Sequence, residues 1–349
     1  MEAGRLTDDG TGAWFGRRTS RWQDWPPDRL LAAKQQLGVR ISVVIPAKNE
    51  QRTVGGVVSA IARSLVDEIP LVDELVVMDS DSTDATGAAA ADAGAVVYRA
   101  SEVAPATGTF PGKGEALWKS LLVTKGDLLV FIDADLTQWG PHFVSGLLGP
   151  LLADQQVRLV KGYYTRVRTE SDGSTSTEGG RVTELVARPL ISLWWPELAA
   201  VVQPLAGEWA ARRSLMESLS IPVGYGVELA TLMDTVSGYG LDAVAQVDLG
   251  SRAHRHQANH DLALMAAELL MVAERRRPDR AGSGGDPRNP RRAGSGGDPR
   301  NPRRLPDQLT PPVVSLRQFV RDEAGQPRQV SRPVPLAERP PAAEFRSDD

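Results

Sequence analysis

The stretch Leu128-Leu-Val-Phe-Ile-Asp-Ala-Asp135 decides the fold. Its first five residues are apolar without a break, which is typical of a strand buried on both faces of a sheet. It ends with Asp133 and Asp135, and residues two apart in a strand point the same way. We therefore predict a strand over residues 127–132 that delivers two carboxylates into one pocket at its carboxyl end.

Three more apolar runs lie upstream and alternate with segments of helical spacing. We predict strands at residues 41–45, 73–78 and 95–98, and helices at residues 27–37, 53–65, 85–93 and 114–123. This alternation is typical of an α/β fold, a Rossmann-like and mainly parallel sheet covered on both faces. Ligands bind such sheets beyond the carboxyl ends of the strands. The polar clusters at residues 46–50, 79–84 and 133–135 follow three predicted strands there. Further on, residues 163–176 have the pattern of a hairpin.

Composition excludes several classes of protein. The 349 residues are 41% hydrophobic and 24% charged, which is ordinary for a globular chain with a real core. The absence of cysteine removes disulfides, thiolate zinc sites and cysteine nucleophiles. A net charge of −4 offers no global basic field, so we expect no nucleic-acid partner. There is neither a signal-peptide pattern nor an apolar run long enough to span a membrane, so we expect a cytoplasmic protein.

The paired carboxylates of Asp133 and Asp135 suit a hard divalent cation, which would offset the charge of a departing diphosphate. An isolated Asp-x-Asp is weak evidence, because solvated carboxylates at a strand end fit the tripeptide equally well. Without cysteine, any further metal ligand must be oxygen or imidazole. Three of the four histidines, His254, His256 and His260, stand within seven residues. Neither a dinucleotide fingerprint nor a P-loop is present, so those two nucleotide sites lose their support.

Four segments together resemble a known family. VVIPAKNE (residues 43–50), VVMDSDSTDAT (76–86), GKGEALWKS (112–120) and LLVFIDAD (128–135) resemble the nucleotide-binding half of GT-A glycosyltransferases in order and spacing. With Gly179–Glu184, Pro204–Glu208 and Arg252–His256 added, the set is similar to the retaining glucosyl-3-phosphoglycerate synthases of actinobacteria. That family would imply a GT-A fold and a hexosyltransferase reaction. The reaction moves glucose from UDP-glucose to D-3-phosphoglycerate with a divalent metal, Mg²⁺ or Mn²⁺, as the first step towards glucosylglycerate and methylglucose lipopolysaccharide.

The resemblance also implies roles for single residues. Lys113 would meet the diphosphate, Asp133 would lie close to the donor sugar and Glu228 would orient it, and these three would be catalytic. Asp135 and His254 would hold the metal. The complete donor-binding set would be Pro46, Ala47, Glu50, Ser80, Lys113, Asp133, Ala134, Leu205, Gly207 and Glu228. The acceptor phosphate would be held by Gly180, Arg181, Val182 and Thr183, and its carboxylate by His256.

Each of these residue patterns also has a plainer interpretation. Lys113 could be a surface lysine, Thr183 could cap a helix, and Glu228 could begin a helix over residues 229–236, where a negative charge is favourable. Ser82 or Thr83 is expected to cap the helix that starts at Ala85. The pair Trp194 and Trp195 is expected in the core, with some contact to a second copy in a homodimer.

With the resemblance in place, we divide the chain into five parts. They are a lead-in (1–39), a nucleotide-sugar-binding part (40–150), an acceptor-binding part (151–277), a loop containing a twelve-residue Gly/Pro/Arg tandem repeat (278–304) and a tail (305–349). Three alternatives stay open for the function. They are a mannosyl donor with the same acceptor, an inverting polyprenyl-phosphate glycosyltransferase, and a nucleotide-sugar sensor or scaffold without catalysis.

Overall fold

A computed structural model describes residues 11–169, 175–176, 180–253, 259–278, 314–321 and 326–345. Every structural statement below concerns these residues. His254, His256 and the tandem repeat lie outside them, so the predictions made for those residues stay predictions.

One sheet of nine strands forms the centre of the molecule, and its order is β1-β10-β6-β8-β5-β2-β3-β4, with β7 beside β6. The four strands predicted first are β2 (Ile41–Ala47), β3 (Glu74–Asp79), β4 (Val96–Arg99) and β5 (Leu128–Phe131), and they are confirmed. They pair in parallel, whereas β8 (Trp209–Arg212) runs antiparallel to both of its neighbours. The predicted hairpin is confirmed as β6 (Leu159–Thr169) and β7 (Thr175–Ser176). The edge beyond β6 consists of β10 (Val244–Ala253) and β1 (Thr19–Arg21).

The predicted helices also form. They are α2 (Pro27–Leu37), α3 (Val54–Ile61) with its π-helical continuation η2 (Ala62–Glu68), α4 (Thr86–Asp92) and α5 (Lys113–Val123). The helix named over residues 229–236 is present as α9 (Val227–Tyr239). The structure adds α1 (Thr11–Arg18), α6 (His142–Ala153), α7 (Arg188–Trp194), α8 (Arg213–Ser218) and α10 (Asn259–Arg276).

Both faces of the sheet are buried, as the unbroken apolar strands predict. Val43 and Ile45 of β2 lie in one core cluster with residues of α3 and α6. Val44, between them, lies in a second cluster with residues of α5 and α9. Successive side chains of one strand therefore pack into two separate cores, one on each face of the sheet. Trp195 is 5% exposed and belongs to the second cluster, with Trp194 packed against it, so the core prediction for this pair is confirmed.

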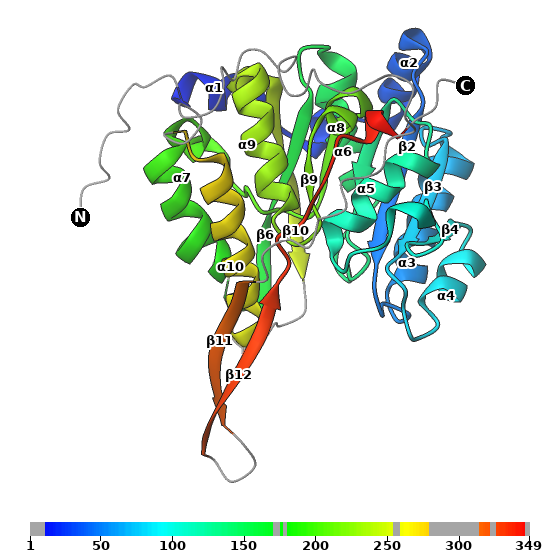
Figure 1. The fold of residues 1–349 in the computed structure, drawn as a ribbon. Coiled ribbons are helices and arrows are strands. Elements are labelled where there is room, and N and C mark those ends of the chain that lie inside the picture. The colour runs from blue at the N-terminus through cyan, green and yellow to red at the C-terminus, as the bar shows by residue number, and fades with distance from the viewer. Residues whose placement is uncertain are drawn as a thin grey trace, which may run out of the picture.

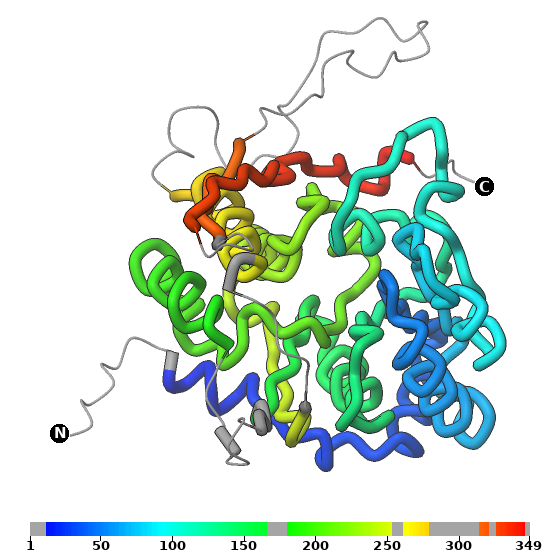
Figure 2. Tube along the Cα trace, turned by 90° about the horizontal axis from the view of Figure 1, so that it is seen from below, coloured from blue at the N-terminus to red at the C-terminus, as the bar shows by residue number. Residues whose placement is uncertain are grey.

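The end of the chain returns to the body. Strands β11 (Val314–Arg321) and β12 (Pro327–Val334) form an antiparallel hairpin that projects from the rest of the fold (Figure 1). Residues 335–345, which we name the C-terminal strap, then run from the α10 side of the molecule to the α5 side (Figure 2). Within the strap, β13 (Glu338–Arg339) pairs with β9 (Ile221–Pro222). This part of the tail therefore packs on the body of the molecule as an extended segment.

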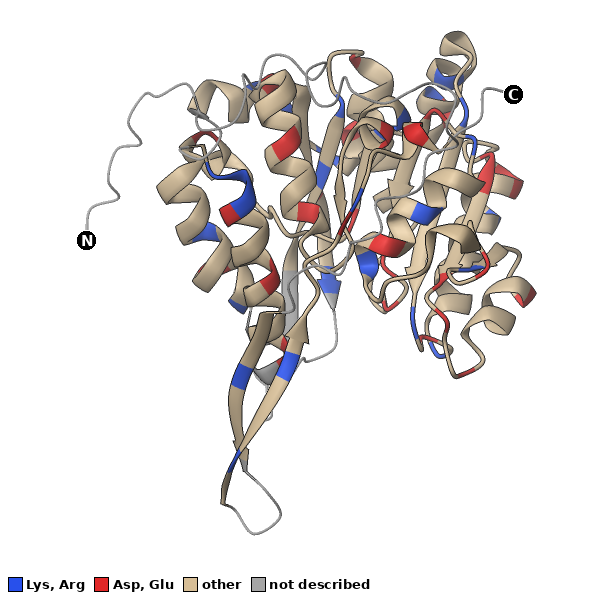
Figure 3. Cartoon of the chain, viewed as in Figure 1, with Lys and Arg blue, Asp and Glu red and all other residues tan. Residues whose placement is uncertain are grey.

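Residues of both charge signs are interspersed along the helices and strands (Figure 3). None of the helices described combines the length and apolarity that crossing a bilayer requires.

Candidate active site

The loops after β2 and β3 are joined by hydrogen bonds into one wall. The amide of Ser80 donates to the carbonyl of Ala47 at 2.8 Å, and the amide of Asn49 donates to Oγ of Ser82 at 2.9 Å. The amide of Glu50 donates to the Thr86 hydroxyl at 2.8 Å. Four residues of the predicted donor-binding set, Pro46, Ala47, Glu50 and Ser80, thus lie on two adjoining strand ends.

The helix-cap prediction in this wall is wrong. Residue Ala85 stands at the cap position of α4, and the amide of Thr86 donates to Oδ1 of Asp84 at 3.0 Å. Ser82 and Thr83 bond instead to Asn49 of the neighbouring loop, since the Thr83 amide reaches Oδ1 of Asn49 at 2.9 Å. Ser82 and Thr83, which the local sequence predicted as helix caps, are therefore used in the contact between the two loops.

Lys113 reaches the site because the backbone around it packs closely on another loop. Gly112 has a φ of 132°, a region that favours glycine, and a Cβ there would stand 2.3 Å from the carbonyl oxygen of Val223. A Cβ on Gly114 would stand 1.8 Å from the carbonyl oxygen of Pro222. The two glycines thus let the start of α5 approach the turn before α9.

Lys113, Asp133 and Glu228, the three predicted catalytic residues, meet. Nζ of Lys113 lies 2.6 Å from Oδ1 of Asp133 and 2.8 Å from Oε1 of Glu228. The Lys113 side chain is 14% exposed, so the surface-lysine interpretation is wrong. Burial opposes its charge, but the carboxylates of Asp133 and Glu228 outweigh burial and raise the pKa of Lys113. Glu228 also stands in the first turn of α9, so its helix-start interpretation holds alongside the site role.

Arg252, from the end of β10, joins the two carboxylates of the Asp-x-Asp segment. One of its nitrogens lies 3.2 Å from Oδ1 of Asp135 and 3.5 Å from Oδ2 of Asp133. The other lies 2.7 Å from Oε1 of the fully buried Glu208 and 2.7 Å from the Tyr164 hydroxyl. Asp133 and Asp135 therefore do face one point, as predicted from their spacing.

The pKa values of the two carboxylates of the segment are shifted in opposite directions. Burial opposes the charge of Asp133, but Lys113 and Arg252 overcome it, and the pKa of Asp133 is lowered. Burial, followed by the Asp133 charge, raises the pKa of Asp135. A further cation beside Asp135 would therefore stabilise its ionised form.

The segment Leu205–Gly207 lies directly against Asp133. A Cβ on Gly207 would stand 2.2 Å from Oδ2 of Asp133, so glycine is needed for this approach. Nζ of Lys161, on β6, donates to the carbonyl of Ala206 at 2.8 Å. Burial lowers the pKa of Lys161 to about 8.

The residues around Asp135 fit a divalent cation. Their charged ligands are carboxylate oxygens, which Mg²⁺ and Mn²⁺ prefer. A guanidinium nitrogen already occupies the point that Asp133 and Asp135 share, so the position favours positive charge. Among the described residues no group of three or more potential metal-binding side chains is found, and His254 is not among them. Asp135 would hold the ion. Strand β10, which ends at Ala253, leads the chain toward the site.

The predicted acceptor residues Gly180–Thr183 open a helical segment on the α10 side. Thr183 begins the π-helical turn η4 (Thr183–Ala187), which packs against α10. Val182 and Thr183 are buried, at 8% and 6% exposure, and Thr183 does not cap the helix, so that interpretation is wrong. Arg181 and Gly180 are half-buried.

Sequence reasoning missed four polar residues of the site: Tyr164, Lys161, Glu208 and Arg252. Lys161 and Tyr164 lie within β6, Glu208 directly precedes β8 and Arg252 is the penultimate residue of β10, and all four are buried. A charge within a buried strand is itself a signal, because such a group needs a partner.

Comparisons with known proteins identify the family of this chain. The family profile of glycosyl transferase family 2 matches residues 42–196. A curated glucosyl-3-phosphoglycerate synthase from Mycolicibacterium paratuberculosis is 41% identical over 357 residues, covering 99% of this chain and 98% of the relative. This chain belongs to the glucosyl-3-phosphoglycerate synthase family.

Solved structures of the synthase family share the fold. One is the glucosyl-3-phosphoglycerate synthase of Mycobacterium tuberculosis in complex with Mn²⁺, UDP-glucose and phosphoglyceric acid, with a TM-score of 0.75 and 40% identity over 95% of this chain and 99% of that chain. Another, with Mg²⁺ and UDP, gives a TM-score of 0.76 and 41% identity over 94% and 99%. The chain is therefore a hexosyltransferase with a GT-A fold, and both predictions are confirmed.

Proposed function

We propose that this chain transfers glucose from UDP-glucose to D-3-phosphoglycerate with retention of the anomeric configuration. The observation that carries the proposal is the contact of Lys113 with both Asp133 and Glu228 at the end of β5. This contact lies beside Gly207, at the same edge of the sheet as the loops that follow β2 and β3. The solved relatives of the family add the donor, acceptor and metal named in their complexes.

In this proposal the uridine lies against the wall formed by the β2 and β3 loops. Lys113 contacts the diphosphate, and Mg²⁺ or Mn²⁺, when bound at Asp135 and His254, supplies positive charge that stabilises the departing UDP. Glu228 and Asp133 hold the sugar through its hydroxyls. Glu228 is paired with Lys113 and 6% exposed, which does not suit an attacking nucleophile.

Retention then follows from attack on the face that UDP leaves. The acceptor hydroxyl oxygen bonds to the anomeric carbon while the bond from that carbon to the diphosphate oxygen breaks. The released phosphate oxygen takes the hydroxyl proton. This chain's residues contribute by positioning and electrostatics rather than by covalent chemistry.

The test measures UDP release with UDP-glucose and Mn²⁺, with and without 3-phosphoglycerate. We expect release that depends on the acceptor, and loss of at least about 10²-fold in Asp135→Ala, because that variant lacks a metal-binding carboxylate. GDP-mannose and a polyprenyl phosphate serve as competing substrates. Donor binding without acceptor-dependent UDP release would favour the sensor alternative, and a fully active Asp135→Ala enzyme would contradict the metal role.

The acceptor cradle makes a separate prediction. Arg181 and the amides near Gly180 suit a phosphate, because a guanidinium fork binds its oxygens in pairs. We expect Arg181→Ala to raise KM for 3-phosphoglycerate by about tenfold or more while KM for UDP-glucose changes little. Steady-state kinetics with each substrate varied in turn measure both. An equal rise in both constants would place Arg181 elsewhere.

We also propose that the chain forms a homodimer. Leu185 and Leu193 are 75% and 70% exposed, and Phe319 on the projecting hairpin is 67% exposed. An isolated two-stranded hairpin is marginally stable in water, so a partner surface would stabilise it. Sedimentation equilibrium of the wild type and of Phe319→Glu tests this, and a wild type that is monomeric at micromolar concentration overturns it.

A further inference from the structure

The turn before α9, residues 222–226, is held by hydrogen bonds from two other elements. The amide of Glu115 donates to the carbonyl of Val223 at 3.0 Å, and the amide of Gly114 donates to that of Gly224 at 3.2 Å. The Val223 amide donates to the carbonyl of Ala337 in the C-terminal strap at 3.1 Å. This turn, which we name the α9 turn, therefore fixes where Glu228 stands relative to Lys113.

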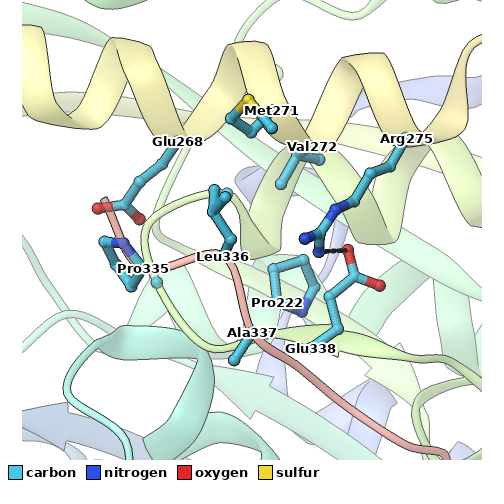
Figure 4. Close-up of a pocket in the computed structure, with 11 residues that line it drawn as sticks. Pro222, Glu268, Met271, Val272, Arg275, Pro335, Leu336, Ala337 and Glu338 are labelled. Carbon is cyan, nitrogen blue, oxygen red and sulfur yellow. Dashed lines mark ion pairs between the residues drawn. The ribbon is translucent and has the colours of Figure 1, made fainter. Parts of the chain in front are cut away.

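Glu268 on α10 supplies a third attachment. Its Oε2 accepts a hydrogen bond of 2.6 Å from the amide of Tyr225. A Cβ on Gly224 would stand only 1.9 Å from the same oxygen, so carboxylate and backbone are in close contact. Glu268 lines a narrow cavity in which the side chains of α10 face the strap and Pro222 (Figure 4).

Within the part of the chain that the structure describes, no cation matches the buried Glu268 carboxylate. The side chain belongs to a residue 4% exposed, and no cation among the described residues is paired with it. Arg275, which lines the same cavity, pairs instead with Glu338 at 3.5 Å. Burial, with a smaller effect of Glu228, raises the pKa of Glu268 to about 7, although the Tyr225 amide opposes the rise. A buried carboxylate in this state costs stability, which favours a positioning role over a purely structural one.

We propose that Glu268 is a positioning residue for the transfer reaction, which holds the α9 turn so that Glu228 meets Lys113. The inference rests on the proposed function of that pair. The connection is short, because Tyr225 precedes Glu228 by three residues and the turn also bonds to Gly114, the neighbour of Lys113. Glu268 touches neither substrate in this account and acts through the backbone that it holds.

Three variants test the role with the full chain and Mn²⁺. In Glu268→Ala the Tyr225 amide loses its acceptor, and we expect kcat/KM for UDP-glucose to fall by about tenfold or more, because small displacements of positioning groups are costly. KM for 3-phosphoglycerate should change less than about twofold. Glu268→Gln retains an acceptor oxygen and should restore kcat/KM to within about threefold of the wild type.

The matched control is Asp234→Ala. Asp234 also joins α9 to α10, through Arg276 at 2.8 Å, but does not touch the α9 turn. It should lower Tm and leave kcat/KM unchanged. Wild-type kcat/KM in Glu268→Ala, an equal loss in Asp234→Ala, or no recovery in Glu268→Gln would each overturn the proposal.

A stability cycle tests the contact without turnover, and so separates this inference from the proposed function. Gly224→Ala places a methyl group against Oε2 of Glu268, whereas in Glu268→Ala that oxygen is gone and the next neighbour, Cγ of Pro335, lies at 3.4 Å. We expect Gly224→Ala to lower the urea midpoint clearly less in Glu268→Ala than in the wild type. Additive losses would overturn the contact on which the proposal stands.

Discussion

Gly207 and Asp133 approach each other more closely than any side chain on residue 207 would allow. Asp133 is held in place by Lys113 and Arg252, so it cannot withdraw from a new methyl group. We expect Gly207→Ala to lower kcat by about 10²-fold or more, since it displaces either the Asp133 carboxylate or the segment Leu205–Gly207 that is proposed to contact the donor. The free energy of unfolding should fall by about 1–3 kcal/mol.

Steady-state kinetics and urea denaturation measure these two effects. Gly238→Ala is the matched control, because a Cβ there meets nothing within 4 Å and the residue lies in α9. That control should keep full activity and gain about 0.5–1 kcal/mol of stability. An active Gly207→Ala enzyme would show that the segment moves away without consequence.

Lys161 predicts an unusual dependence of stability on pH. Its pKa is about 8 in the folded chain, because burial disfavours the charge, whereas the unfolded chain keeps the ordinary lysine pKa of 10.5. Between these two pKa values the unfolded chain binds more protons, so wild-type stability rises with pH through this side chain. The slope is at most about 1.4 kcal/mol per pH unit.

Lys161→Met lacks this contribution. The difference in unfolding free energy, wild type minus variant, should therefore be flat below about pH 7.5 and grow between about pH 8 and 9.5. Urea denaturation at each pH measures it. Parallel curves for the two proteins across this interval would contradict the lowered pKa.

At the scale of elements, Arg339 attaches the C-terminal strap to α5. Its guanidinium donates to both oxygens of Glu115 on α5, at 2.7 and 2.6 Å, and lies between the rings of Phe110 and Trp118. We expect Arg339→Met to cost about 3–5 kcal/mol, because it leaves the 1% exposed Glu115 carboxylate without its main partner.

The double variant Glu115→Met/Arg339→Met separates charge from shape. Replacing both partners by apolar side chains removes the Glu115 charge, but Lys119, which lies 3.6 Å from Glu115, then keeps, among the described residues, only the Ala100 carbonyl and the Thr109 hydroxyl, so part of the loss should be recovered. Chemical denaturation of the two single variants and the double variant gives the coupling energy. A double variant as unstable as Arg339→Met alone would show that packing against the rings, rather than the ion pair, holds the strap.

Elements near in sequence could be predicted, whereas long-range partners could not. Unbroken apolar runs identified β2 to β5, and the spacing of Asp133 and Asp135 predicted that they share a pocket. Hydrophobic periodicity states which face a residue occupies but not which segment lies against it. The pairing of β1 with β10, the reach of Arg252 to Asp135 and the strap over α5 are contacts of that second kind. The meeting of Lys113 with Glu228 was expected only through family resemblance.

Across the whole molecule, Glu115 on α5 depends on a partner residue that is translated much later. Arg339 and Glu115 are separated by 224 positions. At roughly 5–20 residues per second, a ribosome needs about 11–45 seconds to make the intervening chain. On the nascent polypeptide, the Glu115 carboxylate therefore lacks its arginine partner until Arg339 has been synthesised. A chain that ends between residues 254 and 338 would contain every strand of the central sheet and lack the guanidinium that binds the buried Glu115 carboxylate, and cells clear incompletely stabilised chains of this kind through chaperones and proteases.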